Sequence, residues 1–455
     1  MSIDTPAATR AEAAALRRER SQAERLPFIA TQALLCLAVF AAAIIPRAAW
    51  VAYNDREPQG LNDPTMYNLL ADIMADGGGY SRPTGEPFAY YPVGFPATVA
   101  GLKKAQDIVG ADRDIFSIKM MNGIFGAVTT VIVFLLASRL LGAKTGLAAA
   151  GLHAVFPSQV FYTGTILSEP LFTMLFMLGV LILAWDPWDR DGMSYTRLFA
   201  AGLVLSAATM TRGITLVFPL VLFAVWFFYL HSKKRALLQT AVLFAGIAVL
   251  TVPWAIRNSV QFGTIVGPST NLGDDLCIGN FYGSDGRFTI TGKCFEGTEG
   301  MTPDEVEIHR NREGLRIAVE DVLSHPLRMP ELVAKKAYWL LYKDDDGLWA
   351  AESYGNDWFI DHPLREILSF SANSIYYATG ALVVLGAAAF ALGRDVRRVF
   401  LLLAMLYILA VPLAFFGDPR FHYPAVPIAI IIAAATVVWL QERRRTLAVT
   451  AERGA

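Results

Sequence analysis

Long apolar runs recur along the chain and are separated by shorter polar stretches. Each run approaches the roughly 20 residues that an α-helix needs to cross a bilayer. The pattern predicts an all-α polytopic membrane protein with about ten transmembrane helices, and the motif TMTRG interrupts two of them. We place the spans at residues 27–49, 115–137, 144–161, 165–184, 197–211, 214–230, 236–255, 370–392, 398–415 and 423–440.

Basic residues predict the orientation, because Lys and Arg concentrate in cytoplasmic loops. Arginines crowd both ends of the chain and recur in every second loop, so we expect both termini in the cytoplasm. The N-terminal tail is too long and polar to resemble a cleaved signal peptide. The chain would then comprise an N-terminal transmembrane module (1–255, with the outer loop 50–114), a large extracytoplasmic segment (256–369), C-terminal transmembrane helices (370–440) and a cytoplasmic tail (441–455).

Composition supports the membrane assignment. Hydrophobic residues make up 54% of the 455 residues and charged residues only 17%, with a mean hydropathy of +0.41. The formal net charge of -1 gives no indication of nucleic-acid binding, and we expect none. No internal sequence repeat is visible.

The first outer segment contains a short amphipathic pattern. Apolar residues recur at helical spacing from Met66 to Met74, and three glycines follow. This predicts a helix that lies along the membrane surface, and a second element should run from Tyr90 to about Gln106.

Asp63 stands directly before Pro64, at the expected start of the first of these helices. Asp is a favoured N-cap and Pro a favoured next residue, so a structural role is a strong alternative. Asn62 could cap the helix equally well and would leave Asp63 free. The local sequence does not decide between these two interpretations.

The second outer segment contains Cys277 and Cys294, and the residues between them predict two short strands around a Ser-Asp-Gly turn. Because an extracytoplasmic location permits disulfides, we predict a bridge between the two cysteines. Two reduced thiols are the alternative. Residues 344–347, Asp-Asp-Asp-Gly, lack the alternating spacing of a calcium loop, so we expect a solvated turn there.

Several motifs together resemble those of the polytopic GT-C glycosyltransferases, a group that includes protein O-mannosyltransferases and aminoarabinose transferases. Asp63 lies four residues before Tyr67 and is followed by Gly79-Tyr80 and YYPVGFP. Later landmarks of the group resemble GTILSEPLFTMLFMLG (with Glu169), TMTRGITLVFP, PWAIRN followed by STNLGDDLCIGN, SHPLRMPELVAKKAYW and GDPRFHYPAVP. The chain departs from the group where many members have Asp-Glu and this one has Asp63-Pro64.

The resemblance implies a function. Such enzymes take a sugar from a polyprenyl phosphate and give it to an acceptor on the extracytoplasmic face, usually with inversion. The expected acceptor is a lipid, a protein or a polysaccharide, and the expected location is the bacterial cytoplasmic (inner) membrane. The group contains metal-using and metal-free members, so no cofactor is certain and a divalent metal would be compatible.

The chemistry needs a base for the acceptor hydroxyl, and we assign that role to Asp63. Glu169 would orient the acceptor, hold a metal, or position Asp63. Both acidic residues precede prolines, so helix capping is the structural alternative.

The same chemistry needs positive charge for the departing phosphate, which the planar guanidinium group suits. We expect Arg420 and Arg257 to contact the phosphate, with Arg212 as a weaker candidate and His422 as a ligand of phosphate or metal. The resemblance also implies that Tyr67 binds substrate. Ordinary alternatives are a surface ion pair for Arg420, a flanking charge for Arg257 and a snorkelling side chain for Arg212.

A polytopic transporter or lipid-linked sugar flippase is the main rival interpretation. Transporters more often show internal repeats and broken helices near the midplane, whereas the polar candidates here gather at one face. An O-antigen ligase or polymerase is a third reading, which the acidic first outer loop argues against.

Overall fold

The computed structural model describes residues 31–290, 292–392 and 395–454, with side chains up to residue 447. The predicted all-α membrane fold is confirmed: the regular elements of the described residues are helices, accompanied by two isolated β-bridges. The start of the first predicted span, residues 27–30, lies outside the described residues.

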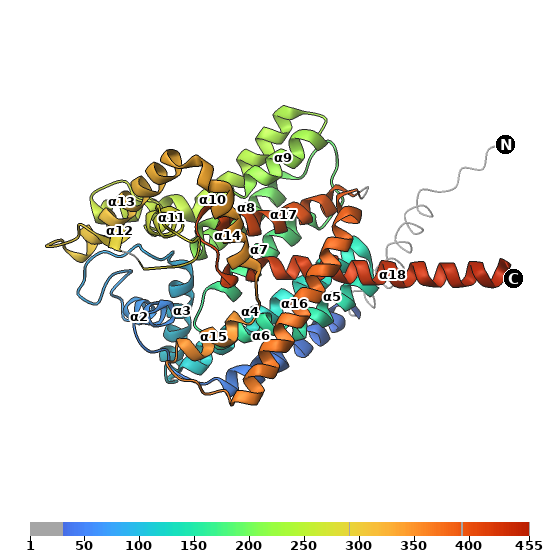
Figure 1. The fold of residues 1–455 in the computed structure, drawn as a ribbon, viewed down its shortest axis with the longest axis horizontal. Helices are drawn as coiled ribbons and strands as arrows, with labels where there is room; N and C mark the ends of the chain where they lie inside the picture. Colours follow the sequence, from blue (N-terminus) through green and yellow to red (C-terminus); the bar gives the residue numbers. More distant parts are fainter. Residues whose placement is uncertain (1–30, 291, 393–394, 455) are drawn as a thin grey trace, which may run out of the picture.

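Among the described residues, six helices are long and apolar enough to cross a membrane (Figure 1). They are Thr31–Tyr53, α4 (Ile115–Leu141), α10 (Lys233–Phe262), α16 (His362–Ala391), α17 (Val396–Ala414) and Pro419–Leu447, which joins η4 (Pro419–Ala425) to most of α18 (Val426–Gly454).

The other four predicted spans correspond to shorter helices: α5 (Ala143–Val155), α7 (Glu169–Ala184), α8 (Tyr195–Thr211) and α9 (Pro219–Tyr229). At 1.5 Å per residue, the 13 residues of α5 reach only about 20 Å. Pro157 ends that helix, and the chain continues through α6 (Pro157–Phe161) and η1 (Tyr162–Gly164). The interruption at TMTRG appears as η2 (Gly213–Thr215).

The core lies where α4, α7, α8, α10 and α18 pack together around a large buried apolar cluster. Gly202 of α8 and Gly246 of α10 allow the closest approach. A Cβ on Gly202 would lie 2.5 Å from the carbonyl oxygen of Leu243. Small residues at a helix contact are typical of membrane bundles, because they let backbones approach each other.

The two segments that the sequence predicts outside the membrane, within 50–114 and 256–369, are here called the first and second inserted segments. They lie at the end of the molecule opposite the C-terminal end of α18 (Figure 1). The first contains α2 (Asp63–Ala75) and α3 (Gly94–Val109). The second contains α11 (Leu272–Asn280), α12 (Gly292–Phe295), α13 (Pro303–Ser324), η3 (Pro326–Arg328), α14 (Met329–Leu341) and α15 (Asp346–Ser353).

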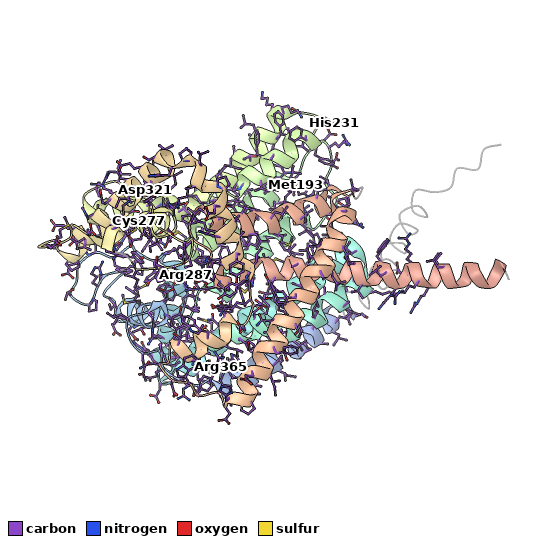
Figure 2. The ribbon with its side chains drawn as sticks, in the orientation of Figure 1. Met193, His231, Cys277, Arg287, Asp321 and Arg365 are labelled. Atoms are coloured by element: carbon purple, nitrogen blue, oxygen red, sulfur yellow. A yellow bond between two sulfur atoms is a disulfide. The ribbon has the colours of Figure 1, made fainter. Side chains whose placement is uncertain are left out.

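The predicted pair of strands between the cysteines is wrong for the described part of that segment. Residues 277–280 complete α11 instead, and the following loop is clamped onto α13. Asp321 of α13 accepts hydrogen bonds from the Tyr282 amide (2.7 Å) and from Lys293 Nζ (2.5 Å). A disulfide joins Cys277 and Cys294, whose Cα atoms are 5.9 Å apart. Figure 2 labels Cys277 and Asp321 at this end of the molecule.

Candidate active site

Asp63 begins α2, but it is not the residue that caps the helix. Asn62 Oδ1 accepts the Thr65 amide at 3.1 Å and so fills that role. The Asp63 carboxylate is therefore free for contacts with other segments. Its Oδ1 accepts a hydrogen bond from the Tyr91 hydroxyl at 2.8 Å, and its Oδ2 pairs with Arg420 Nη1 at 2.6 Å.

Glu169 begins α7 and its side chain is fully buried. Its Oε1 accepts from Arg420 Nε and from Arg212 Nη1 together. Its Oε2 is buried and has no hydrogen-bond partner among the residues described. The four charged side chains thus form a continuous series, which we call the ion-pair chain: Asp63, Arg420, Glu169 and Arg212.

The ends of helices explain why these residues meet. Arg212 is the residue at which α8 ends, Glu169 is the first residue of α7, and Arg420 lies in η4, just before α18. Asp63 reaches the same place from the first inserted segment. Two carboxylates and two guanidinium groups balance in charge, which is how buried ionic groups become tolerable.

Further carboxyl groups surround the ion-pair chain. Asp418 Oδ1 accepts the Arg420 amide at 2.9 Å, and burial together with the nearby Asp346 raises the pKa of Asp418 to about 6. Burial, with smaller contributions from Asp274 and Asp63, raises the pKa of Asp275 to about 7. The site can therefore take up protons close to neutral pH.

Tyr67 packs behind the site rather than into the ion-pair chain. Its buried ring lies 4.9 Å from that of Tyr91 and 5.2 Å from that of Phe95, measured between centroids. Burial, reinforced by the charge of Asp63, raises the pKa of its hydroxyl, so this side chain stays neutral.

The structure places Arg257 away from the ion-pair chain. Its Nη2 donates to the Tyr80 carbonyl at 2.6 Å and its Nη1 to the Phe88 carbonyl at 3.2 Å. The guanidinium therefore ties the end of α10 to the first inserted segment, which is a different arrangement from the expected contact with phosphate.

His422 likewise faces other partners. Its Nε2 lies 2.7 Å from Asp344 Oδ1 and its Nδ1 lies 2.7 Å from the Leu340 carbonyl. The expected solvated turn at 344–347 is wrong, because the Asp344 side chain is only 3% exposed. Asp346 is also engaged, and accepts from the Tyr162 hydroxyl at 2.9 Å.

Sequence reasoning did not single out Tyr91, Asp418, Asp346 or Asp275 as members of the site. Tyr91 and Asp418 lie inside the motifs YYPVGFP and GDPRFHYPAVP, so those motifs carried a usable signal. Asp275 lies in STNLGDDLCIGN, a stretch after PWAIRN that also resembles the GT-C group, so a similar signal was present there.

The described residues contain no group of three or more His, Cys, Asp or Glu side chains that could hold a metal ion. The open choice between metal-using and metal-free chemistry therefore stays an expectation.

No family model matches the sequence, and no curated protein matches it. Among solved structures, the chain is similar to the oligosaccharyltransferase AglB from Archaeoglobus fulgidus in complex with an inhibitory peptide and a dolichol-phosphate. The TM-score is 0.54 at 15% identity, over 92% of this chain and 52% of that one. A structure of an oligosaccharyltransferase from the same organism with Zn and sulfate gives a TM-score of 0.52 at 15% identity, over 90% of this chain and 50% of that one.

ArnT from Cupriavidus metallidurans in the apo state matches with a TM-score of 0.40 at 13% identity, over 91% and 77% of the two chains, which is too distant to support an argument. The chain spans about half the length of the oligosaccharyltransferase. At this level of identity the likeness establishes the fold alone. The chain therefore shares the fold of this oligosaccharyltransferase over most of its length.

Proposed function

We propose that this chain, which has the fold of the GT-C membrane glycosyltransferases, moves a sugar from a polyprenyl-phosphate donor to an acceptor outside the cytoplasm. The observation that carries the proposal is the ion-pair chain of Asp63, Arg420, Glu169 and Arg212 at clustered helix ends. The dolichol-phosphate in the similar archaeal oligosaccharyltransferase is consistent with such a donor.

The proposed reaction is a single inverting displacement with Asp63 as general base. The acceptor hydroxyl oxygen forms a bond to the anomeric carbon of the sugar while the bond from that carbon to the phosphate oxygen breaks. Asp63 takes the hydroxyl proton, and the bonding electrons leave with the lipid phosphate. Arg420 and Arg212 offer the charge-assisted hydrogen bonds that stabilise this leaving group.

Glu169 is a positioning residue in this mechanism. Its carboxylate is fully buried and already accepts from both arginines, so it holds the two guanidinium groups in place. Of the three roles considered from the sequence, this arrangement favours positioning Asp63, through Arg420.

Donor binding would also activate Asp63. Arg420 uses Nε for Glu169 and Nη1 for Asp63, so an arriving phosphate that binds this guanidinium draws its charge away from these carboxylates. When the phosphate attracts Arg420, Asp63 is released from its ion pair and becomes available to the acceptor. The same competition predicts that polyprenyl phosphate binds more tightly when the Asp63 charge is removed.

We place the chain in the bacterial cytoplasmic membrane, with the site on the extracytoplasmic face and both termini in the cytoplasm. This placement rests on the basic loops of the sequence and on the position of both inserted segments at one end of the molecule. The divisions at residues 255, 369 and 440 are part of the same proposal.

The test uses purified protein in detergent with a radiolabelled polyprenyl-phosphate sugar, with and without EDTA. Transfer without a sealed vesicle separates an enzyme from a transporter. Asp63→Asn should lower transfer by about 10²–10⁴-fold, the usual contribution of a general base, while it keeps the wild-type melting temperature and binds polyprenyl phosphate at least as tightly. Arg316→Gln, on the exposed face of α13, is the matched control. Full transfer by a folded Asp63→Asn protein would contradict the assignment.

A further inference from the structure

A cavity of about 360 Å³ lies between the two inserted segments. Its walls come from the first inserted segment, with Met66, Phe88, Tyr90 and Tyr91, and from α11 and α13, with Asp274, Glu307 and Arg310. This volume falls within the roughly 300–1,000 Å³ typical of small-molecule sites.

The cavity adjoins the proposed base. Tyr91 forms part of its wall, and the hydroxyl of the same residue donates to Asp63 Oδ1 at 2.8 Å. Met66, another wall residue, lies one helical turn after Asp63 in α2. A molecule in this cavity would therefore lie beside Tyr91, whose hydroxyl is hydrogen-bonded to the Asp63 carboxylate.

The cavity has hydrogen-bonding groups to spare. Asp274 pairs with Arg310 through Oδ2, and the Tyr90 hydroxyl also lies close enough to act on this carboxylate. Its buried Oδ1 has no partner that meets hydrogen-bond geometry within the described part of the chain. Arg310 Nε and Arg82 Nε are also buried and unpaired there. A buried polar atom without a partner costs about 1–3 kcal/mol, so a ligand that satisfies it gains affinity.

Other polar side chains of the cavity wall already have hydrogen-bond partners and hold the two inserted segments together. Glu307 Oε1 accepts from the Ala89 amide (2.8 Å) and from Thr270 Oγ1 (2.6 Å), and its Oε2 pairs with Arg82 at 2.7 Å. These contacts fasten α13 to the first inserted segment. They keep the spare groups of Asp274 and Arg310 in place beside the aromatic rings.

We propose that this cavity binds the acceptor and that the acceptor is a carbohydrate, an inference that rests on the proposed transferase function. A sugar hydroxyl donates one hydrogen bond and accepts others, which matches the spare carboxylate oxygen and the spare guanidinium nitrogens. The aromatic rings of Phe88, Tyr90 and Tyr91 offer flat apolar faces against which a sugar ring can lie.

A peptide acceptor fits less well. An extended peptide is commonly held by main-chain hydrogen bonds to an open strand edge. The described residues form no strand, so this cavity offers no such edge. The wall also comes from the two inserted segments rather than from the long apolar helices, so an acyl chain is not the expected occupant.

The test supplies wild-type protein in detergent with a radiolabelled polyprenyl-phosphate sugar and with one of two acceptor preparations. One is purified cell-envelope polysaccharide and the other is a peptide pool from secreted proteins. The release of polyprenyl phosphate is measured separately from the entry of label into each acceptor. Label should enter the polysaccharide and resist protease.

Asp274→Asn and Arg310→Lys should raise the half-saturating polysaccharide concentration by roughly tenfold, as loss of one hydrogen bond to a charged group gives. Their maximal rates and their binding of polyprenyl phosphate should stay near wild type. Arg316→Gln, on the exposed face of the same helix, should change nothing. A melting temperature near wild type excludes unfolding as the cause.

Three outcomes overturn the inference: label in the peptides, no label in the polysaccharide despite Asp63-dependent release of polyprenyl phosphate, or unchanged half-saturation in both folded cavity variants. If the wild-type protein consumes no donor at all, the proposed function itself fails, and this result is distinct from the other three.

Discussion

The ion-pair chain makes a quantitative prediction about how Glu169 and Arg212 depend on each other. Glu169 is fully buried and is shared by two arginines, so Glu169→Gln removes the acceptor charge of both. Breaking a buried ion pair costs about 3–5 kcal/mol because it leaves an uncompensated charge. Arg212 is 17% exposed and Glu169 keeps Arg420 when Arg212 is lost, so Arg212→Gln should cost about 1.5–3 kcal/mol.

The double variant tests whether these two costs have a common origin. If the side chains interact, Glu169→Gln and Arg212→Gln together should cost less than the sum, by a coupling energy of about 0.5–3 kcal/mol. The assay is unfolding of the purified protein in detergent by titration with denaturant, followed by intrinsic fluorescence. Unfolding must be reversible for the energies to be meaningful.

A matched pair controls for the exposure of the charges. Glu331 and Lys335 form an ion pair of 2.7 Å on α14 with side chains 69% and 49% exposed. The corresponding cycle there should give a coupling of about 0.3–0.5 kcal/mol, as exposed pairs four residues apart on a helix do. If the Glu169 and Arg212 costs add to within about 0.5 kcal/mol, the reasoning about a shared buried network is refuted.

Three further predictions follow from other parts of the molecule. The pKa of Asp418 is raised to about 6 in the folded protein. Between about pH 4 and pH 6 the folded protein therefore keeps this carboxyl group protonated, whereas the unfolded chain has lost the proton. Stability should therefore fall as pH rises from about 4 to 6, and Asp418→Asn should flatten that fall in thermal unfolding scans. Gly279→Ala should destabilise the protein strongly, because the added Cβ would lie 1.7 Å from a backbone carbonyl oxygen at the end of α17. Gly101→Ala is the control: its Cβ meets nothing within 4 Å, so it should stabilise the protein by about 0.5–1 kcal/mol. The melting temperatures of the two variants should therefore move in opposite directions. Replacing Cys277 and Cys294 by serine should lower the free energy of unfolding by about 2–4 kcal/mol, whereas an unchanged value would count against a structural disulfide.

Much of the fold is predictable from the sequence because membrane helices follow from local hydropathy. Each predicted span coincides with a helix, and the amphipathic pattern between Met66 and Met74 forms α2. The lengths are less predictable. Prolines and short polar breaks such as TMTRG divide apolar runs into helices that are too short to span a bilayer, and hydropathy averaged over a window hides these breaks.

The sequence predicted those members of the candidate site that lie in recognisable motifs. It did not predict which of two similar arginines reaches the site, because that depends on how the helices pack. Arg212 and Arg257 look alike in the sequence, since each follows an apolar run. In the structure α8 ends at Arg212, so its side chain turns into the site. In contrast, α10 continues through Arg257 to residue 262, so this guanidinium lies in the side of a helix and meets the first inserted segment.

His422 differs from Arg420 for a similar geometric reason. Both belong to η4, and in a 3₁₀-helix residues two apart are rotated by about 240° about the axis. The two side chains therefore leave the turn in different directions, one towards Glu169 and the other towards Asp344. Because the two residues are close in the sequence, we expected both to contact the phosphate, but the geometry of this turn directs their side chains to different partners.

The short helices also explain how a charged site can exist in an apolar bundle. A helix that crossed the full bilayer would place its end residues at the water surface, where exposed ion pairs contribute little. Here α7 begins at Glu169, a residue with no exposed surface, so the polar end of this helix lies inside the protein. The ends of α8 and η4 meet it there and supply arginines. A charged group in such a place is costly unless it is paired, and the pairing fixes its direction. The same breaks that shorten the helices thus create the fixed array of guanidinium groups to which we assign the stabilisation of the departing phosphate.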